Sequence, residues 1–266
     1  MSEAIFGGRS ATNDFIDWKS VFLKMLVGLL AIFLALEVAF YLVLVPANAD
    51  IRVEIRGTET VGMDELCSLA GITGNEKWLR FNTALAASRL AANPLFESVT
   101  VSKQFPDTVV VSVTERHAVA FSYGTKDGRT VPVEIDRNGI AFRVASNVMG
   151  TELPLITGPQ FDNPVAGQRL NPALKPLLAQ IEALERDKPL LLSALSEIKI
   201  EEKPFGGYDL VLYPVHTPVR VKTDKALNED AIQYMMLVLD VIGGLQLDID
   251  EIDIRAGTVA YKVKGA

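Results

Sequence analysis

One apolar run constrains this chain more than any other feature. Met25–Val45 reads MLVGLLAIFLALEVAFYLVLV, and only Gly28 and Glu37 in it are not apolar. A helix over this run is roughly 30 Å long, the thickness of the hydrocarbon core of a bilayer. A signal peptide has a shorter apolar region followed by small residues at a cleavage site. We therefore predict a retained transmembrane helix over residues 24–46, preceded by a tail at 1–23.

Glu37 lies near the middle of the predicted transmembrane helix. A charged residue there costs about 2.5–3.5 kcal/mol on the insertion scale, and about 14 Leu, Ile, Val and Phe residues offset that cost. Two interpretations stay open. The carboxyl group hydrogen-bonds to the transmembrane helix of a partner, or it is a tolerated polar residue without a role.

Basic residues near the two ends of the helix predict its orientation. Arg9, Lys19 and Lys24 lie on the N-terminal side, and Arg52 is the nearest counterweight on the other side. The excess of basic residues marks the cytoplasmic side. We expect a cytoplasmic N-terminus and an extracytoplasmic position for residues 47–266. A net charge of −7 with no basic run argues against nucleic acid as the main ligand.

The segment after the helix predicts a small domain over residues 50–117. Alternating apolar and polar residues indicate strands, and turn or capping residues separate them from two helical segments. The expected order is β-α-α-β-β, so that two helices cover one face of a three-stranded sheet. The strands are expected at Ile51–Ile55, around Val99–Ser102 and at Asp107–Glu115, and the helices at Asp64–Ala70 and after the N-cap Asn82 as far as Asn93-Pro94.

This order, with these residues, resembles a POTRA domain. The segments that carry the resemblance are Ile51–Gly57, Asn93–Phe96, Val99–Val101 and Phe105–Arg116. A strand that ends in Glu115-Arg116 and continues into Ala118-Val-Ala120 is similar to the exit of the POTRA domain in the FtsQ/DivIB family of bacterial cell-division proteins. The resemblance continues toward the C-terminus and covers most of residues 24–264.

The pattern of residues 118–266 predicts a larger, strand-rich domain with two helices. We therefore expect the whole chain to be of the α+β class. Apolar alternation marks the strands, and Asn-Gly at 138–139 favours a hairpin. One helix starts at Asn171-Pro172 and ends at Lys188-Pro189, and the other covers about 225–242. Strands are expected at 131–135, 140–144, 153–157, 197–201, 208–213, 218–221, 252–254 and 259–263.

The sequence offers few residues for catalysis, so we expect no enzymatic activity and no cofactor. His117 and His216 each lie beside a strand, and the lone Cys67 lies in a predicted amphipathic helix where a buried thiol is expected. No glycine-rich loop stands between a strand and a helix. The densest carboxylate group suits Ca²⁺ or a solvated strand entry, and we favour the second reading: Asp248, Asp250, Glu251 and Asp253.

The family resemblance implies a non-enzymatic bitopic scaffold of the divisome. It links early and late cell-division proteins at the septum, in the cytoplasmic (inner) membrane, with one transmembrane pass and the C-terminal domains in the periplasm or outside the cell. In this family the POTRA domain and the transmembrane segment are implicated in recruitment. The distal β domain, here residues 118–266, binds FtsB/DivIC-like and FtsL-like coiled-coil membrane proteins, at the last strand and the helix before it.

The resemblance and a physical argument place the partner site at the C-terminal strand. The family's Asp-Leu-Arg signature appears as Asp253-Ile254-Arg255, and Ala256 stands where some relatives have an aromatic residue. If the C-terminal strand lies at the border of its sheet, its unpaired N–H and C=O groups can accept the strand of another chain. Arg255 then binds a partner carboxylate, or alternatively forms an internal salt bridge. The predicted partner-binding residues are Asp253, Arg255, Val259, Ala260, Tyr261, Lys262 and Val263.

Two other functions are weighed against this one. A different inner-membrane assembly scaffold, such as a secretion-complex subunit, has the same outline. A membrane-anchored enzyme acting on cell-wall polymer is the second rival. A barrel-assembly protein needs a long series of alternating strands after its POTRA domain, and residues 118–266 with two amphipathic helices do not supply it. Proline at Ala260 or Lys262 is expected to abolish partner binding if strand addition operates.

Overall fold

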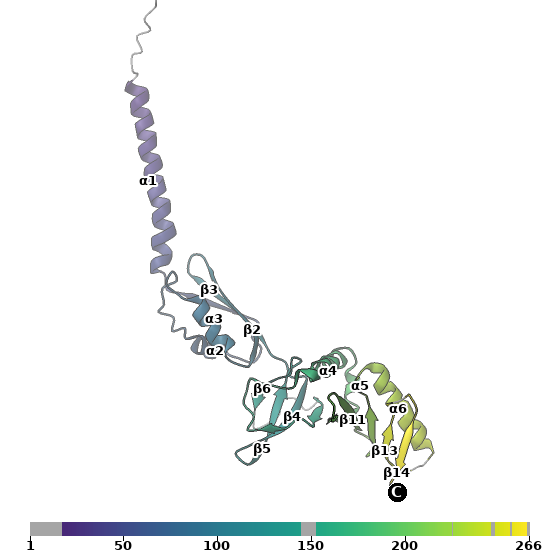
Figure 1. Ribbon diagram of the computed structural model, residues 1–266. Coiled ribbons are helices and arrows are strands. Elements are labelled where there is room, and N and C mark those ends of the chain that lie inside the picture. The colour runs from purple at the N-terminus through teal and green to yellow at the C-terminus, as the bar shows by residue number, and fades with distance from the viewer. Residues whose placement is uncertain (1–17, 145–152, 225, 246–247, 256, 265–266) are drawn as a thin grey trace, which may run out of the picture.

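The computed structural model describes residues 18–144, 153–224, 226–245, 248–255 and 257–264. Figure 1 shows an elongated molecule in which helix α1 (Trp18–Asn48) lies at one end. A small domain follows α1, and a larger domain lies beyond it and carries the last strand, β14 (Ala260–Val263), at the opposite end. Strand β14 and helix α1 thus lie at opposite ends of the molecule (Figure 1).

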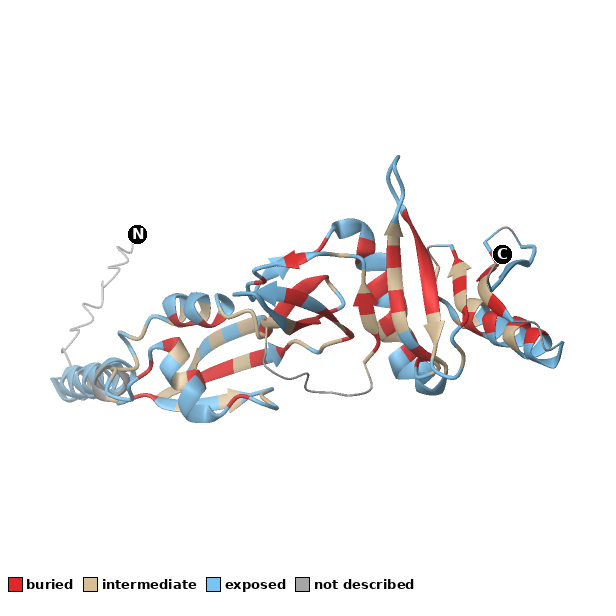
Figure 2. Ribbon diagram, turned by 90° about the horizontal axis from the view of Figure 1, so that it is seen from below, coloured by how far each residue is buried: buried red, intermediate tan, exposed pale blue. Residues whose placement is uncertain are grey.

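Helix α1 fits a membrane anchor. It is long and apolar enough over Trp18–Val43 to cross a membrane, and none of its most apolar segment is buried against the rest of the protein. Figure 2 shows α1 almost wholly exposed. The helix includes the predicted span 24–46, and Glu37 lies on its exposed surface. Of the predicted tail at 1–23, residues 1–17 lie outside the described residues, and residues 18–23 belong to α1.

The small domain has the predicted β-α-α-β-β order. Its elements are β1 (Arg52–Arg56), α2 (Met63–Ala70), α3 (Thr83–Ala91), β2 (Phe96–Gln104) and β3 (Thr108–Glu115). Strand β3 is central, pairing in parallel with β1 and antiparallel with β2. The apolar side chains of one sheet face and of both helices form one core, which includes Leu66, Leu90, Phe96, Val109 and Val111. The Asn82 side chain accepts a hydrogen bond from Leu85 N, so the predicted N-cap of α3 is confirmed.

Glu115, the last residue of β3, holds the loop between β1 and α2. Its carboxylate accepts hydrogen bonds from the backbone N–H groups of Glu59, Thr60 and Val61 at 2.8–3.2 Å and from the Thr60 hydroxyl. Burial alone raises the pKa of Glu115, but these hydrogen bonds outweigh burial and hold its pKa below the ordinary value. The buried carboxylate is therefore a charged anchor for the loop.

Arg116 joins the small domain to the large one. Its Nε donates to Pro94 O at 3.0 Å within the small domain, and its Nη1 lies 2.5 Å from Asp136 Oδ2 in the large domain. Asp136 is 2% exposed, and its other carboxylate oxygen accepts from the backbone amides of Asn138 and Ile140. A buried pair whose remaining acceptors are satisfied in this way fixes the relative position of the groups that it joins.

The large domain is built on one sheet of 11 strands within the described residues. Its order is β14-β13-β12-β11-β10-β7-β4-β5-β6-β9, with β8 beside β4. The bounds, in chain order, are β4 (Ala120–Lys126), β5 (Arg129–Ile135), β6 (Ile140–Val144), β7 (Leu155–Thr157), β8 (Phe161–Asp162), β9 (Gln168–Arg169), β10 (Leu195–Glu202), β11 (Tyr208–Pro214), β12 (Arg220–Thr223), β13 (Ile249–Asp253) and β14 as given above.

Helices cover one face of this sheet. They are η1 (Pro172–Leu174), α4 (Lys175–Asp187), α5 (Pro189–Leu192) and α6 (Glu229–Gly244), and their buried apolar residues share one core with the strands. Helix α6 connects the parallel strands β12 and β13, as a crossover helix does. The two long helices and the hairpin β5–β6 match the prediction. Strands β4, β8 and β9 and the four-residue α5 are additional elements that the apolar pattern does not predict.

We expect Glu115→Gln to loosen the loop between β1 and α2. Gln keeps the size of the side chain, but it removes the charge and one acceptor oxygen from a buried site that faces four donors. The free energy of local opening should fall by about 1–3 kcal/mol. Native-state hydrogen exchange of the amides of residues 59–61 measures it. The matched variant Glu54→Gln changes an exposed ion pair in the same domain and should leave these amides protected. Equal protection in both variants would contradict this role for Glu115.

Candidate partner-binding edge of the large domain

Strand β14 forms the outer edge of the sheet. It pairs with β13 on one side, and no strand of the described residues pairs with its other side. The apolar side chains in and next to this strand are unusually open to solvent: Val259, Tyr261 and Val263 are 41%, 55% and 43% exposed. An exposed edge with apolar side chains is a place where another strand can be added. The sequence leaves open whether the last strand lies at the border of its sheet, and in the structure it does.

The register shows which backbone groups of β14 point outward. Lys264 N donates to Asp248 O of the neighbouring strand segment at 2.9 Å, so this amide points inward. Successive amides of a strand point to opposite sides of it. The amides of Ala260 and Lys262 therefore point toward β13, and those of Tyr261 and Val263 point to the outer edge.

The two faces of the edge strand differ in character. Tyr261 stands opposite Ile252, and Val263 stands opposite Ile249, whose side chains belong to the core beneath the helices. Opposite residues of an antiparallel pair share a face, so Tyr261 and Val263 lie on the helix-covered face. Lys262, paired with Glu251, and Ala260 lie on the other face, which is polar.

Helix α6 adds an exposed apolar stripe to this end of the domain. Its buried face is formed by Ile232, Met235, Val238 and Ile242. A second set of apolar residues recurs at helical spacing beside the buried face and stays exposed by 37–62%. These residues are Tyr234, Leu237, Val241 and Leu245. The sequence shows that residues 229–244 are rich in apolar residues, but it does not show which of them form the buried face and which form the exposed stripe.

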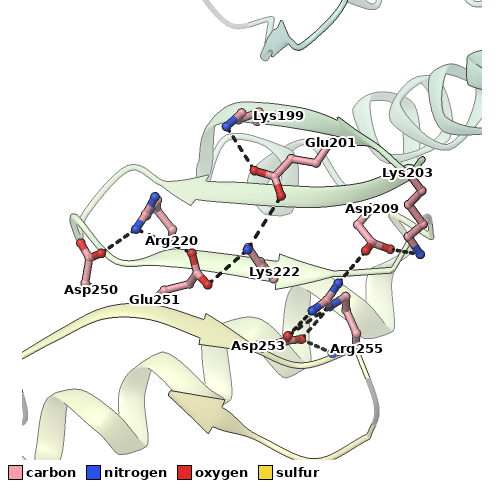
Figure 3. A network of polar contacts seen from close by, with 10 residues as sticks. All are labelled: Lys199, Glu201, Lys203, Asp209, Arg220, Lys222, Asp250, Glu251, Asp253 and Arg255. Carbon is pink, nitrogen blue, oxygen red and sulfur yellow. Dashed lines mark hydrogen bonds and ion pairs between the residues drawn. The ribbon is translucent and has the colours of Figure 1, made fainter. Parts of the chain in front are cut away.

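Arg255 is held by carboxylates of its own chain (Figure 3). Its Nη1 lies 2.6 Å from Asp209 Oδ2, and its Nε and Nη2 donate to the Asp253 carboxylate at 2.9 and 2.5 Å. Asp209, on β11, also forms an ion pair with Lys203, whose Nζ lies 2.6 Å from Asp209 Oδ1. The internal salt bridge, one of the two readings of Arg255, is thus what the structure contains. Asp209 was missed because nothing local in the sequence links it to Arg255.

These contacts shift the pKa of both carboxyl groups. The hydrogen bond from Arg255 lowers the pKa of Asp253, against a smaller opposite effect of burial. For Asp209, burial is the largest effect and raises the pKa, but hydrogen bonds from Lys203 and Arg255 outweigh it and the pKa lies below its ordinary value. The pair of aspartates with Arg255 is therefore charged at neutral pH and fixes the start of the connection between β13 and β14.

Further ion pairs cross the polar face of the sheet between β10 and β13. Figure 3 shows them as one network in which Lys222 lies between two carboxylates. Arg220 pairs with Asp250 at 2.5 Å, and Glu251 with Lys222 at 3.3 Å. Three of the four carboxylates weighed for Ca²⁺ are thus paired with cations. Across the parts of the chain that the structure describes, no group of three or more His, Cys, Asp or Glu residues is placed to hold a metal ion.

The structure brings together the predicted site residues of the C-terminal strand and separates them from the rest. Asp253 and Arg255 flank a surface depression that Ala260 also lines. Glu37 lies in α1, at the other end of the molecule (Figure 1). Ala256 lies outside the described residues. An open strand edge of this kind offers backbone groups with which an extended polypeptide can pair.

Comparisons with known proteins give a matching domain model and several similar proteins. Residues 51–116, the small domain, match the model of the POTRA domain, FtsQ-type. The cell division protein FtsQ of Geobacter sp. (strain M21) is 27% identical over 171 residues, and DivIB of Geobacillus kaustophilus (strain HTA426) is 25% identical over 194 residues. FtsQ of Myxococcus fulvus (strain ATCC BAA-855 / HW-1) is 26% identical over 216 residues.

These matches extend well beyond the small domain. They cover 64%, 70% and 79% of this chain, in the same order, and 59%, 68% and 72% of the relatives. The chain thus spans less than two thirds of the length of the Geobacter protein. The small domain and much of the large domain are similar to proteins that are named for cell division.

We expect Asp209→Asn to remove an acid-sensitive contribution to stability. The pKa of Asp209 is lowered in the folded chain, so its contribution is complete above the unfolded value of about 4 and is lost as the pH falls through the folded value. At pH 7 the variant should be less stable by about 1–3 kcal/mol, because Arg255 and Lys203 lose their anionic acceptor. Urea unfolding of the detergent-solubilised chain from pH 7 to pH 3 measures this. The two curves should converge at low pH, and parallel curves would contradict the assignment.

Proposed function

We propose that this chain, a member of the FtsQ/DivIB family of cell-division proteins, is a non-catalytic assembly protein of the bacterial divisome. Helix α1 holds it in the cytoplasmic membrane with the N-terminus in the cytoplasm and the two domains outside. In this position it links early and late cell-division proteins at the septum. Three relatives named for cell division and the FtsQ-type POTRA match support this role.

The open edge of β14 carries the proposal. The outward amides of Tyr261 and Val263 are placed to pair with an added strand, and the exposed side chains of these residues lie on the same sheet face as α6. An added strand gains backbone hydrogen bonds from the edge and apolar contacts from the exposed side chains of Tyr261 and Val263. The partners that we propose are FtsB/DivIC-like and FtsL-like coiled-coil membrane proteins, each contributing an extended segment beyond its coiled coil.

Arg255 then acts by positioning rather than by direct recognition. Its guanidinium group is tied to Asp209 and Asp253, so it fixes the connection that leads from β13 into the edge strand. Its side chain is 41% exposed, which leaves a side of the guanidinium open to a partner carboxylate as a secondary contact. In the membrane, we propose that Glu37 on the exposed surface of α1 meets the transmembrane helix of a partner.

The register changes where a proline test of strand addition should be made. Proline at Ala260 or Lys262 removes an amide that points toward β13, so it detaches the edge strand from the fold. Proline at Tyr261 removes an outward amide and leaves the pairing with β13 in place. Tyr261→Pro should weaken partner binding about tenfold or more, since one lost hydrogen bond and the disturbed neighbouring pair together exceed about 1.4 kcal/mol.

The experiment uses the full chain and FtsB/DivIC-like and FtsL-like proteins reconstituted in one membrane. Co-purification yield measures binding, and hydrogen exchange of β13 reports whether the sheet edge stays folded. The matched variant Tyr261→Thr removes the aromatic side chain but keeps the outward amide, so it should bind more strongly than Tyr261→Pro. Equal binding by Tyr261→Pro and the unaltered chain, with β13 protected, would exclude strand addition. Turnover of cell-wall fragments by the purified chain would favour the rival enzyme function instead.

A further inference from the structure

The end of the small domain nearest α1 carries an exposed apolar rim. Leu79 is 52% exposed, in the loop between α2 and α3, and Phe105 is 46% exposed, in the connection between β2 and β3. These two large apolar side chains come from segments far apart in the sequence. Neither is needed to complete the core of the small domain.

Backbone contacts fix this rim directly beside the end of α1. Ala49 follows the last residue of the helix, and its carbonyl accepts a hydrogen bond from Trp78 N at 3.0 Å. Ile51 N donates to Glu76 O at 3.1 Å, and Lys77 Nζ lies 2.7 Å from Asp50 Oδ1. The loop that carries Leu79 is therefore paired with the three residues that leave the helix.

An aromatic contact sets the depth of the rim relative to the bilayer. The ring of Phe105 lies 6.2 Å, centroid to centroid, from the ring of Tyr41 on α1, and 6.2 Å from the ring of Trp78. Tyr41 stands four residues before Val45, the last residue of the apolar run. At 1.5 Å per residue this is about 6 Å on the hydrocarbon side of the end of that run. Figure 1 shows the connection between β2 and β3 beside this end of the helix.

The polar groups of the rim suit the boundary between lipid headgroups and acyl chains. Trp78 donates its indole Nε1–H to Thr108 O at 2.9 Å, so the ring carries no unsatisfied donor. Lys103 Nζ lies 5.3 Å from the centre of the Trp78 ring and donates to Leu79 O at 2.9 Å, which places a cation next to the apolar rim. Aromatic rings and lysines with apolar stems concentrate at this boundary in membrane proteins.

We propose that the small domain docks on the membrane, with Leu79 and Phe105 inserted into the interfacial region of the leaflet from which α1 emerges. The inference rests on the transmembrane anchor of the proposed function and goes beyond it. The occupant of the rim is lipid, because the rim is fixed against the membrane-exit residues of α1, at the depth of Tyr41. Lys103 lies at the level of the phosphate groups.

This second attachment restricts the direction of the whole molecule. The contacts described above hold the small domain to the end of α1, and insertion of Leu79 and Phe105 holds it also to the bilayer, so that the domain keeps one tilt to the membrane. Because the ion pair between Arg116 and Asp136 joins the two domains, the tilt of the small domain also sets the orientation of the large domain. The edge strand β14 is then presented at a fixed orientation to partners that are anchored in the same membrane.

Spin labels on the full chain in lipid vesicles test the proposal. Cys67 is the single cysteine, so Cys67→Ala gives a background for one label at a time. Labels are placed by Leu79→Cys at the rim and by Leu34→Cys in α1. The matched control is Met63→Cys, 53% exposed and close to Val61, which contacts Glu115 at the other end of β3. Vesicles contain phosphatidylethanolamine and phosphatidylglycerol, and collision rates with oxygen and with a water-soluble nickel chelate report lipid and water.

The rim label should behave like the label in α1. Its collision rate with the nickel chelate should be several-fold lower than that of the Met63→Cys label, and its rate with oxygen higher. Equal rates at Leu79→Cys and Met63→Cys, with the Leu34→Cys label in lipid, would overturn the docking and leave the anchor standing. A Leu34→Cys label in water would overturn the anchor and the docking together. In either case the binding of partners to the chain is measured separately by co-purification.

Discussion

Two adjacent residues, Glu115 at the end of β3 and Arg116 directly after it, hold the small domain together and join it to the large domain. The carboxylate of Glu115 accepts hydrogen bonds from three backbone amides and one hydroxyl group of the loop after β1. Arg116 reaches Pro94 on its own domain and the buried Asp136 on the other. Each contact satisfies a buried polar group that would otherwise cost free energy, and the pair of Arg116 with Asp136 joins the two domains.

The neighbouring contacts strengthen the same junction. Arg137 lies 2.9 Å from Glu97 on β2 and 3.4 Å from Glu182 on α4, and the Asn138 side chain donates to Glu97. The hairpin turn between β5 and β6 thereby contacts both domains. Exposed ion pairs of this kind contribute little singly, about 0–1 kcal/mol, but here they surround a buried pair. The junction therefore couples the tilt of the small domain to the position of the distant strand edge.

Periodicity in the sequence predicts most helices and strands, but it does not predict contacts between residues that are far apart in the chain. The spacing of valines places β3, and Asn82 caps α3 as expected, because both signals are local. Strand β4 escapes because Ser122 and Gly124 occupy inward positions, and a Cβ at Gly124 would lie 2.9 Å from Phe161 Cβ. The partner of Arg255 escapes because Asp209 lies 46 residues earlier in the chain. The sequence leaves open whether β14 lies at the edge of the sheet, and the direction of its amides follows only from the register.

The two faces of β14 also restrict what an added strand must look like. Side chains that stand next to Tyr261 and Val263 lie on the helix-covered face of the sheet, beside two exposed apolar side chains. Side chains on the alternate positions lie on the polar face, beside Lys262. A strand that alternates apolar with acidic residues fits both faces, and a shift by one residue would place carboxylates against Tyr261 and Val263. The edge therefore selects the register of its partner as well as its secondary structure.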